Sequence, residues 1–304
     1  MRHPGAVITV GTFDGVHLGH RAVLDEIAER ARRARRRSIL VTFEPHPLEV
    51  VNPQAAPPLL TLGLERREVL AQCELDLVVV FPFTRELSQY SPEQFVLMLR
   101  DRYGLEELVI GHDHGLGKGR AGDEAVLRAL GGRHGFAVDV VDAVSNHGKS
   151  VSSTLIRRAI AGGDLDTARQ FLGRPYSFAD RVVHGAGRGR SIGYRTINLA
   201  VRDPRKLLPP DGVYAVNVEW KNGRAGGMMH QGPRPTFGEA ERSLEVHLFG
   251  VAPDLYGDDV KVSWVSRLRD VMSFPDAEAL KAQLDRDMHA AQAALTGFAA
   301  AASH

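Results

Sequence analysis

The chain has 304 residues, which is long enough for two domains, and its 38 basic and 37 acidic side chains give a formal net charge of +1. This balance creates no global field that would attract DNA or an acidic membrane, so we expect small-molecule partners and no nucleic acid. The single cysteine, Cys73, excludes an internal disulfide framework and a cysteine-based metal cluster, and it fits a cytoplasmic location. No apolar run has the length of a membrane span and the N-terminus lacks a signal-peptide pattern, so we expect no membrane association.

The first half of the chain alternates short apolar runs with segments of helical periodicity. Residues 6–10 form the first predicted strand, and apolar positions at helical spacing behind it predict a helix that begins at Gly19 and His20. The basic run from Arg32 to Arg37 is expected at the solvated end of this helix, where positive charge complements the helix dipole. Four further strands are predicted, at 38–43, 76–81, 107–111 and 137–141. This alternation predicts a parallel sheet with helices on both faces and a ligand site beyond the carboxyl ends of its strands.

The junction between the first strand and the first helix holds an informative group of residues. The stretch from Gly11 to Arg21 contains three glycines and the histidines His17 and His20. A helix N-terminus presents free backbone N–H groups and a partial positive charge, and a spacing of three residues can direct both imidazoles at one phosphate. Two histidines here can also serve only as local caps. The glycines, which let the backbone approach a ligand, favour a phosphate site.

The second half of the chain has a different pattern. Two helices are predicted at 154–161 and 165–172, and short apolar runs follow at 181–184, 212–218, 225–229, 243–248 and 260–265. Because Gly, Pro and Asp clusters separate these runs, they favour an antiparallel barrel. A last helix at 276–295 carries Leu280, Leu284 and Met288 at helical spacing, so one of its faces is expected to pack on the barrel.

The stretch from Gly11 to Arg21 resembles the His-x-Gly-His signature of the nucleotidyltransferase superfamily, in the version found in bacterial bifunctional riboflavin kinase/FMN adenylyltransferases, the FAD synthetases. The resemblance covers nearly the whole chain. Its other motifs, which are specific through their common order and spacing, are FEPHP at 43–47, GKGRAGD at 117–123, SSTLIR at 152–157, LGRPY at 172–176, RPTF at 234–237 and LEVH at 244–247. The resemblance implies an α/β, Rossmann-like nucleotidyltransferase domain with a parallel sheet in residues 1–174. It also implies an antiparallel β-barrel, riboflavin kinase-like domain with a C-terminal helix in residues 175–304.

For the first domain the resemblance implies adenylyl transfer, in which the FMN phosphate attacks the α-phosphorus of ATP and pyrophosphate leaves. Its implied catalytic residues are His17, His20 and Arg157. The implied binding residues are Gly11, Phe13, Asp14, Gly15, Ser152, Ser153 and Thr154 for the nucleotide, and His46 and Asp113 for the flavin. The family usually shows Gly-x-Asp/Asn-Phe-x-Phe-Gly where this chain has GHDHGLG at 111–117, so Asp113 is kept and both aromatic residues are lost. This departure leaves a relaxed flavin acceptor open.

For the second domain the resemblance implies ATP-dependent phosphorylation of riboflavin with Mg²⁺. A loop of Gly and Arg residues after a strand is suited to nucleotide phosphates and includes Gly187, Arg188, Gly189 and Arg190. Thr196 and Asn198 match the family's magnesium-binding pair, Glu245 matches the general base for the riboflavin 5′-hydroxyl, and Arg269 matches an arginine near the flavin. Alternation along residues 244–248 places Glu245 and His247 on one face of their strand.

The second domain also departs from the family pattern. Riboflavin kinases show Gly-Phe-Pro-Thr-Ala-Asn where this chain has Tyr194, Arg195 and Ile197 in place of Phe, Pro and Ala. Proline fixes φ and removes an N–H group, so Arg195 changes the rigidity of the loop and adds charge beside the expected metal. A second departure is MHQG at 229–232, where the family usually has Ala-Asn-Ile-Gly.

Three functions are compatible with this pattern. The leading hypothesis is a bifunctional enzyme that converts riboflavin to FMN and FMN to FAD, each with ATP and Mg²⁺. The second is an adenylyltransferase whose degenerate barrel is a flavin-binding or structural module, which the changes at Arg195 and Ile197 favour. The third is a flavin-sensing paralogue without activity, which the altered segment 112–116 favours. The oligomeric state is left open.

Overall fold

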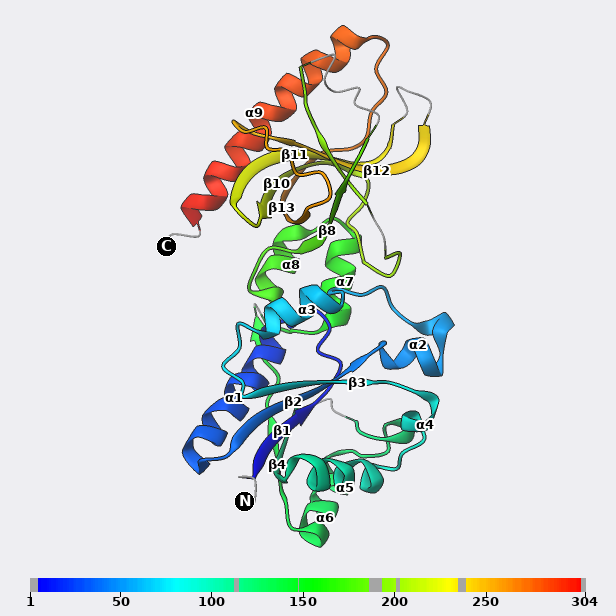
Figure 1. Ribbon diagram of the computed structural model, residues 1–304, viewed down its shortest axis with the longest axis vertical. Coiled ribbons are helices and arrows are strands. Elements are labelled where there is room, and N and C mark those ends of the chain that lie inside the picture. Colours follow the sequence, from blue (N-terminus) through cyan, green and yellow to red (C-terminus); the bar gives the residue numbers. More distant parts are fainter. Residues whose placement is uncertain are drawn as a thin grey trace. The chain divides into compact units, whose positions relative to one another are not determined.

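The protein is described by a computed structural model (Figure 1) that covers residues 5–111, 115–146, 148–185, 193–200, 203–234 and 239–301. The chain divides into two compact units, unit 1 from Met1 to Ser153 and unit 2 from Thr154 to His304. Each unit is described by itself.

Unit 1 is built on a five-stranded sheet with the strand order β3-β2-β1-β4-β5. Each neighbouring pair of strands in this sheet is parallel. The strands are β1 (Ala6–Val10), β2 (Arg37–Glu44), β3 (Leu77–Pro82), β4 (Leu105–Gly111) and β5 (Ala137–Val141). The predicted parallel sheet is confirmed, and the predicted strands differ from the observed ones by at most two residues at either end. The strand order reverses beside β1, and ligands of doubly wound sheets bind at such a point.

The two faces of this sheet are covered by separate apolar clusters. Alternate residues of β1 face opposite sides, because successive side chains of a strand do so. Val7 packs in a cluster with buried residues of α1 (Leu18–Ala34) and α3 (Gly63–Leu70). Ile8 packs in the other cluster, with buried residues of α5 (Pro92–Tyr103) and α6 (Glu124–His134). Helices therefore cover both faces, as Figure 1 shows for α1 and for α5 with α6.

The short elements of unit 1 lie in its connections. They are α2 (Pro47–Val51), η1 (Pro53–Ala55), α4 (Arg85–Ser88), η2 (Lys118–Arg120), β6 (Ser145–Asn146) and β7 (Lys149–Ser150). The predicted helix start at Gly19 and His20 is close to the observed one, since α1 begins at Leu18 with His17 as its N-cap.

Unit 2 contains a closed antiparallel barrel with the strand order β10-β11-β12-β9-β8-β13. The strands are β8 (Ser177–Val183), β9 (Ile197–Leu199), β10 (Gly212–Trp220), β11 (Gly223–Arg234), β12 (Glu239–Leu248) and β13 (Asp259–Arg269). The predicted barrel is confirmed. The three-residue strand β9 was not predicted, and β8 begins four residues before the predicted run.

Three helices belong to the barrel unit or begin at its boundary. They are α7 (Ser153–Ala161), α8 (Leu165–Leu172) and α9 (Ala277–Ala301). Helix α9 packs on the outside of the barrel, where Leu284 and Met288 join a cluster with Ala215 of β10 and Met228 of β11. The predicted apolar face is therefore confirmed for Leu284 and Met288, two of its three expected residues. The helix continues to Ala301, six residues beyond its predicted end, and the last three of these residues are alanines, which favour helix.

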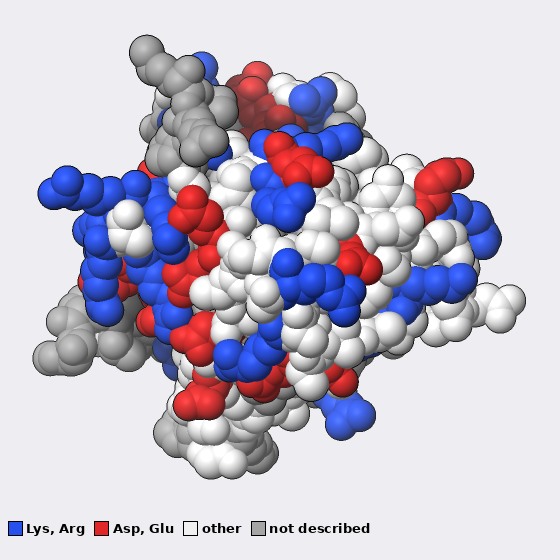
Figure 2. All heavy atoms as spheres, turned by 90° about the horizontal axis from the view of Figure 1, so that it is seen from below, with Lys and Arg blue, Asp and Glu red and all other residues white. Residues whose placement is uncertain are grey.

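The basic run at the end of α1 is distributed among ion pairs. Arg33 pairs with Glu29 at 2.7 Å and Arg36 with Glu106 at 2.6 Å. Figure 2 shows basic and acidic side chains interspersed over the face it presents. Within the described residues, no helix combines the length and the apolar character needed to cross a bilayer.

Candidate active sites

The signature loop connects the end of β1 to the first turn of α1. His17 caps α1, and its Nδ1 accepts a hydrogen bond from the backbone N–H of His20 at 3.2 Å. The two imidazole rings are stacked, with centroids 3.6 Å apart and 15° between their planes. The ring of Phe13 lies 4.6 Å from that of His20. The structure thus brings both predicted histidines together at a helix N-terminus, where the backbone dipole favours an anion.

Asp14 anchors the signature loop from the inside. Its side chain is buried, and its carboxylate accepts hydrogen bonds from the backbone N–H of Leu60 at 3.0 Å and of Thr61 at 2.9 Å, and from the Thr61 hydroxyl at 3.2 Å. The Thr61 hydroxyl in turn accepts a hydrogen bond from the N–H of Gly15, whose φ of 82° lies in the region that favours glycine. Asp14 and Gly15 were predicted to bind nucleotide. The structure gives them a role in fixing the loop, and their nucleotide contact stays a prediction.

The first residue of α7 and the segment before it lie against the same loop. Ser153 Oγ donates a hydrogen bond to the backbone carbonyl of Asp14 at 3.0 Å. A Cβ atom at Gly19 would lie 3.2 Å from His17 Nδ1 and 3.6 Å from the Val151 carbonyl, so only a residue without a side chain leaves this approach relaxed. The start of the second predicted phosphate segment therefore meets the signature loop within unit 1. Thr154 and Arg157 follow in unit 2, and their approach to the histidines stays a prediction.

Arg66 is a buried residue of this region that sequence analysis missed. Its guanidinium donates hydrogen bonds to the carbonyls of Thr12 at 3.1 Å and Phe43 at 3.0 Å, and it lies 3.5 Å from the Glu44 carboxylate. It thereby joins the loop after β1 to the end of β2. Burial lowers the pKa of this guanidinium, and the Glu44 carboxylate acts in the opposite direction. A charged triplet, Glu65 to Arg67, is typical of a solvated helix, so the sequence carried no signal for this clamp.

The two predicted flavin-binding residues of unit 1 have different outcomes. His46 caps α2, where its Nδ1 accepts a hydrogen bond from the N–H of Leu48 at 3.2 Å and Glu49 completes the capping box. This capping fixes the direction of its ring, and contact with a flavin stays a prediction. Asp113 lies outside the described residues, as do the loop residues Gly187, Arg188, Gly189 and Arg190 of unit 2.

In unit 2 the predicted metal and base residues lie together on one face of the barrel. Asn198 of β9 is the register partner of Glu245 of β12, and cross-strand partners project from the same face. Thr196 Oγ1 donates a hydrogen bond to Glu245 Oε2 at 3.3 Å. A Cβ atom at Gly185 would lie 2.1 Å from the Asn198 amide nitrogen, so Asn198 packs against the start of the Gly/Arg loop. The structure thus joins the proposed general base, the hydroxyl and the amide with the beginning of that loop.

This group of side chains fits a magnesium ion in the chemistry of its donors. Hydroxyl, amide and carboxylate oxygens are hard ligands of the kind that Mg²⁺ prefers. Over the described ranges, no cluster of three His, Cys, Asp or Glu side chains is arranged to hold a metal. A magnesium ion at Thr196 and Asn198 would therefore complete its coordination with substrate phosphates and water, as Mg²⁺ commonly does at nucleotide sites.

Arg269, the predicted flavin-contacting arginine, is held by a buried carboxylate of α9. Its Nη2 lies 2.6 Å from Asp287 Oδ2, and its Nε lies 3.0 Å from both oxygens of that carboxylate. Gln283 also donates a hydrogen bond to Asp287, at 2.8 Å. Because the pair is bidentate and Asp287 is only 3% exposed, it fixes the direction of the guanidinium. Flavin contact by Arg269 stays a prediction.

The doubly wound unit with a histidine-bearing loop at a helix N-terminus, and the closed barrel with its cluster of hydroxyl, amide and carboxylate groups, are typical of a two-domain enzyme that uses nucleotides. The family model for FAD synthetase matches residues 1–155, and the model for riboflavin kinase matches residues 172–295. The chain belongs to the family of bifunctional riboflavin kinase/FMN adenylyltransferases.

Individual relatives agree with this assignment over nearly the whole length. A bifunctional riboflavin kinase/FMN adenylyltransferase from Escherichia coli strain K12 is 37% identical over 285 residues, which covers 93% of this chain and 90% of the relative. One of the same name from Pseudomonas fluorescens is 38% identical over 294 residues, covering 96% and 93%. A crystal structure described as a macrolide-efflux protein from Streptococcus pneumoniae is similar with a TM-score of 0.83 and 30% identity, and the similarity covers 93% of each chain.

Proposed function

We propose that this chain phosphorylates riboflavin to FMN in unit 2 and transfers an adenylyl group from ATP to FMN in unit 1, with Mg²⁺ at each site. The observation that carries the kinase half is the contact of Thr196 with Glu245 opposite Asn198. The observation that supports the transferase half is the stacking of His17 and His20 at the start of α1. The single cysteine supports a cytoplasmic location.

The transferase site would act by holding two anions in line. The FMN phosphate oxygen bonds to the α-phosphorus of ATP while the bond to pyrophosphate breaks. Charge that develops on the leaving group would be stabilised by the α1 N-terminus and by His17 and His20, which the loop holds in place before substrate binds. Ser153 extends this anion site from the second segment, and Arg157 would supply a guanidinium.

The kinase site would act by removing a proton and guiding a phosphoryl group. Glu245 accepts the proton of the riboflavin 5′-hydroxyl as that oxygen bonds to the γ-phosphorus and ADP leaves. Thr196 and Asn198 would hold Mg²⁺, which neutralises charge on the phosphates when bound. Arg269 would orient the flavin from β13, in the direction that Asp287 sets.

Product analysis tests both halves in one preparation. Purified protein is incubated with riboflavin, ATP and Mg²⁺, and separately with FMN, ATP and Mg²⁺, and the flavins are separated by chromatography. We expect FMN and FAD from the first mixture and FAD from the second. Absence of both products at high enzyme concentration would refute the proposal.

The adenylyltransferase-only alternative has one sequence observation in its favour, the changes at positions 195 and 197. In the structure Ile197 is 9% exposed and pairs in register with Val246 of β12, so the larger side chain fills the barrel core. This packing favours the bifunctional assignment. FAD from FMN, with no FMN from riboflavin, would establish the alternative.

A further inference from the structure

The proposed magnesium-binding turn of unit 2, residues 193–198, has no proline to limit its backbone, so contacts with other elements must fix its conformation. Position 195 is arginine, whose φ is free, and the turn must nevertheless present Thr196 and Asn198 at fixed positions beside Glu245. Proline at this position would limit φ and so reduce the conformational freedom that the turn loses on folding and on binding a metal. The contacts of the neighbouring residues show how the turn is fixed instead.

Tyr194 ties the turn to helix α9. Its side chain is 7% exposed and lies in the cluster that joins the barrel to α9 through Ala215, Met228 and Ala291. Its hydroxyl donates a hydrogen bond to Asp285 Oδ1 at 2.5 Å. Burial, together with this carboxylate, raises the pKa of Tyr194 to about 12, so the phenol stays protonated and can donate at every physiological pH.

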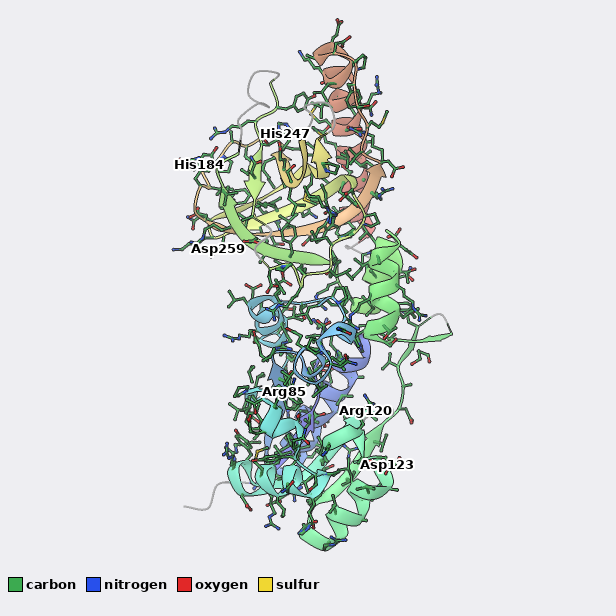
Figure 3. The ribbon with its side chains drawn as sticks, turned by 90° about the vertical axis from the view of Figure 1, so that its right-hand side faces the viewer. Arg85, Arg120, Asp123, His184, His247 and Asp259 are labelled. Atoms are coloured by element: carbon green, nitrogen blue, oxygen red, sulfur yellow. The ribbon has the colours of Figure 1, made fainter. Side chains whose placement is uncertain are left out.

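His247 holds the same turn from the barrel side. Its Nδ1 lies 2.8 Å from the carbonyl oxygen of Arg195, a distance at which the ring N–H donates to the carbonyl. The ring meets that of Tyr194 edge to face, with centroids 5.0 Å apart and 61° between the planes. Because His247 lies two residues after Glu245 in β12, this contact fixes the turn to the strand that carries the proposed base. Figure 3 labels His247 on the barrel.

We propose that Tyr194 and Asp285 form a positioning pair that holds the magnesium-binding turn on helix α9 and replaces the rigidity that proline at position 195 would give. The proposal rests on the kinase half of the proposed function. Neither residue touches the reacting atoms. Each residue fixes the position of the turn, and the turn in this way fixes the positions of Thr196 and Asn198, which would bind the metal.

The test uses three variants of the full chain. Tyr194→Phe keeps the ring in its cluster and removes only the hydroxyl. Tyr194→Phe combined with Arg195→Pro restores a restraint on the backbone without restoring the hydrogen bond. Glu278→Gln, at an exposed position in the first turn of α9, is the control for a polar substitution on this helix away from the turn.

Two readouts separate positioning from a general loss of structure. In riboflavin phosphorylation, we expect Tyr194→Phe to raise KM for MgATP about 5- to 10-fold, since one hydrogen bond to a charged acceptor is lost at a partly exposed site. The rate of FMN adenylylation by the same variant should stay unchanged, which would show that the variant protein is folded. Amide hydrogen exchange, measured by mass spectrometry without substrate, should become faster in residues 193–199 and not in β10.

The double variant decides the mechanism. We expect Arg195→Pro to bring both KM and the exchange of residues 193–199 back toward the parent values, with Glu278→Gln unchanged throughout. A parent enzyme that makes no FMN from riboflavin would overturn the proposed kinase function. A parent enzyme that is active, with a Tyr194→Phe variant equal to it in KM and in exchange, would overturn the positioning pair alone. Slower phosphorylation that Arg195→Pro does not relieve would also contradict it.

Discussion

Replacement of Asp14 by asparagine tests whether the signature loop depends on its buried carboxylate. The oxygen Oδ1 accepts hydrogen bonds from the Thr61 N–H and the Thr61 hydroxyl, and the Leu60 N–H lies 3.0 Å from both carboxylate oxygens. Asparagine has nearly the same shape. It can keep one oxygen toward Thr61, but its NH₂ group then faces the Leu60 N–H, and the negative charge that strengthens all three bonds is lost.

The size of the effect follows from these contacts. Hydrogen bonds to a charged group contribute about 1.5–3 kcal/mol each and neutral ones about 1 kcal/mol, while removal of a buried charge recovers part of the loss. We therefore expect Asp14→Asn to lower the free energy of unfolding of unit 1 by about 2 kcal/mol. This corresponds to a fall in Tm of about 4–8 °C for a unit of this size. KM for ATP in adenylyl transfer should rise, because the histidines are no longer held in place.

The assay uses the fact that the tryptophans lie in only one of the two units. Both tryptophans of the chain, Trp220 and Trp264, lie in unit 2, so their fluorescence reports unfolding of the barrel, whereas far-ultraviolet circular dichroism follows both units. Asp123→Asn is the matched control, because Asp123 is an exposed N-cap of α6 (Figure 3) and asparagine caps as well as aspartate. If Asp14→Asn destabilises unit 1 no more than Asp123→Asn does, the anchoring argument is wrong.

Three further changes test other parts of the two sites. His20→Ala should lower the kcat of FAD formation about 100-fold and leave riboflavin phosphorylation intact, and equal losses in both reactions would contradict a role confined to unit 1. Glu245→Gln should lower FMN formation at least about 100-fold with FAD formation from FMN preserved, and a fully active variant would exclude it as the general base. Arg66→Met removes the guanidinium donor from the Phe43 carbonyl and one of the two side-chain donors of the Thr12 carbonyl, so urea unfolding should show unit 1 less stable by about 1–3 kcal/mol, and an unchanged midpoint would show that the clamp is dispensable.

Local pattern predicted much of the architecture, because strand and helix periodicity are properties of neighbouring residues. The parallel sheet, the barrel and the apolar face of α9 followed from alternation and helical spacing alone. The proximity of His17 and His20 followed from the helix geometry, and the common face of Glu245 and His247 from the strand geometry. The last two inferences join residues that are three and two positions apart.

Contacts between distant residues explain what the sequence did not reveal. Arg66 reaches carbonyls 23 and 54 residues away, and Asp285 bonds a tyrosine 91 residues earlier. In the sequence Arg66 and Asp285 occur in charged, helical segments that are typical of a solvated surface. Strand β9 was also missed, because a strand of three residues is too short to show alternation and forms through its neighbours β8 and β12.

Two buried carboxylates near the proposed binding sites, Asp14 and Asp287, share one arrangement that reconciles them with anionic substrates. A free carboxylate beside a triphosphate would repel it, since like charges in a site of low dielectric interact strongly. Asp14 is surrounded by backbone N–H groups and a hydroxyl, and Asp287 by a guanidinium and an amide. Their charge is balanced by donors within the fold, so each can fix a loop or an arginine without opposing the phosphates.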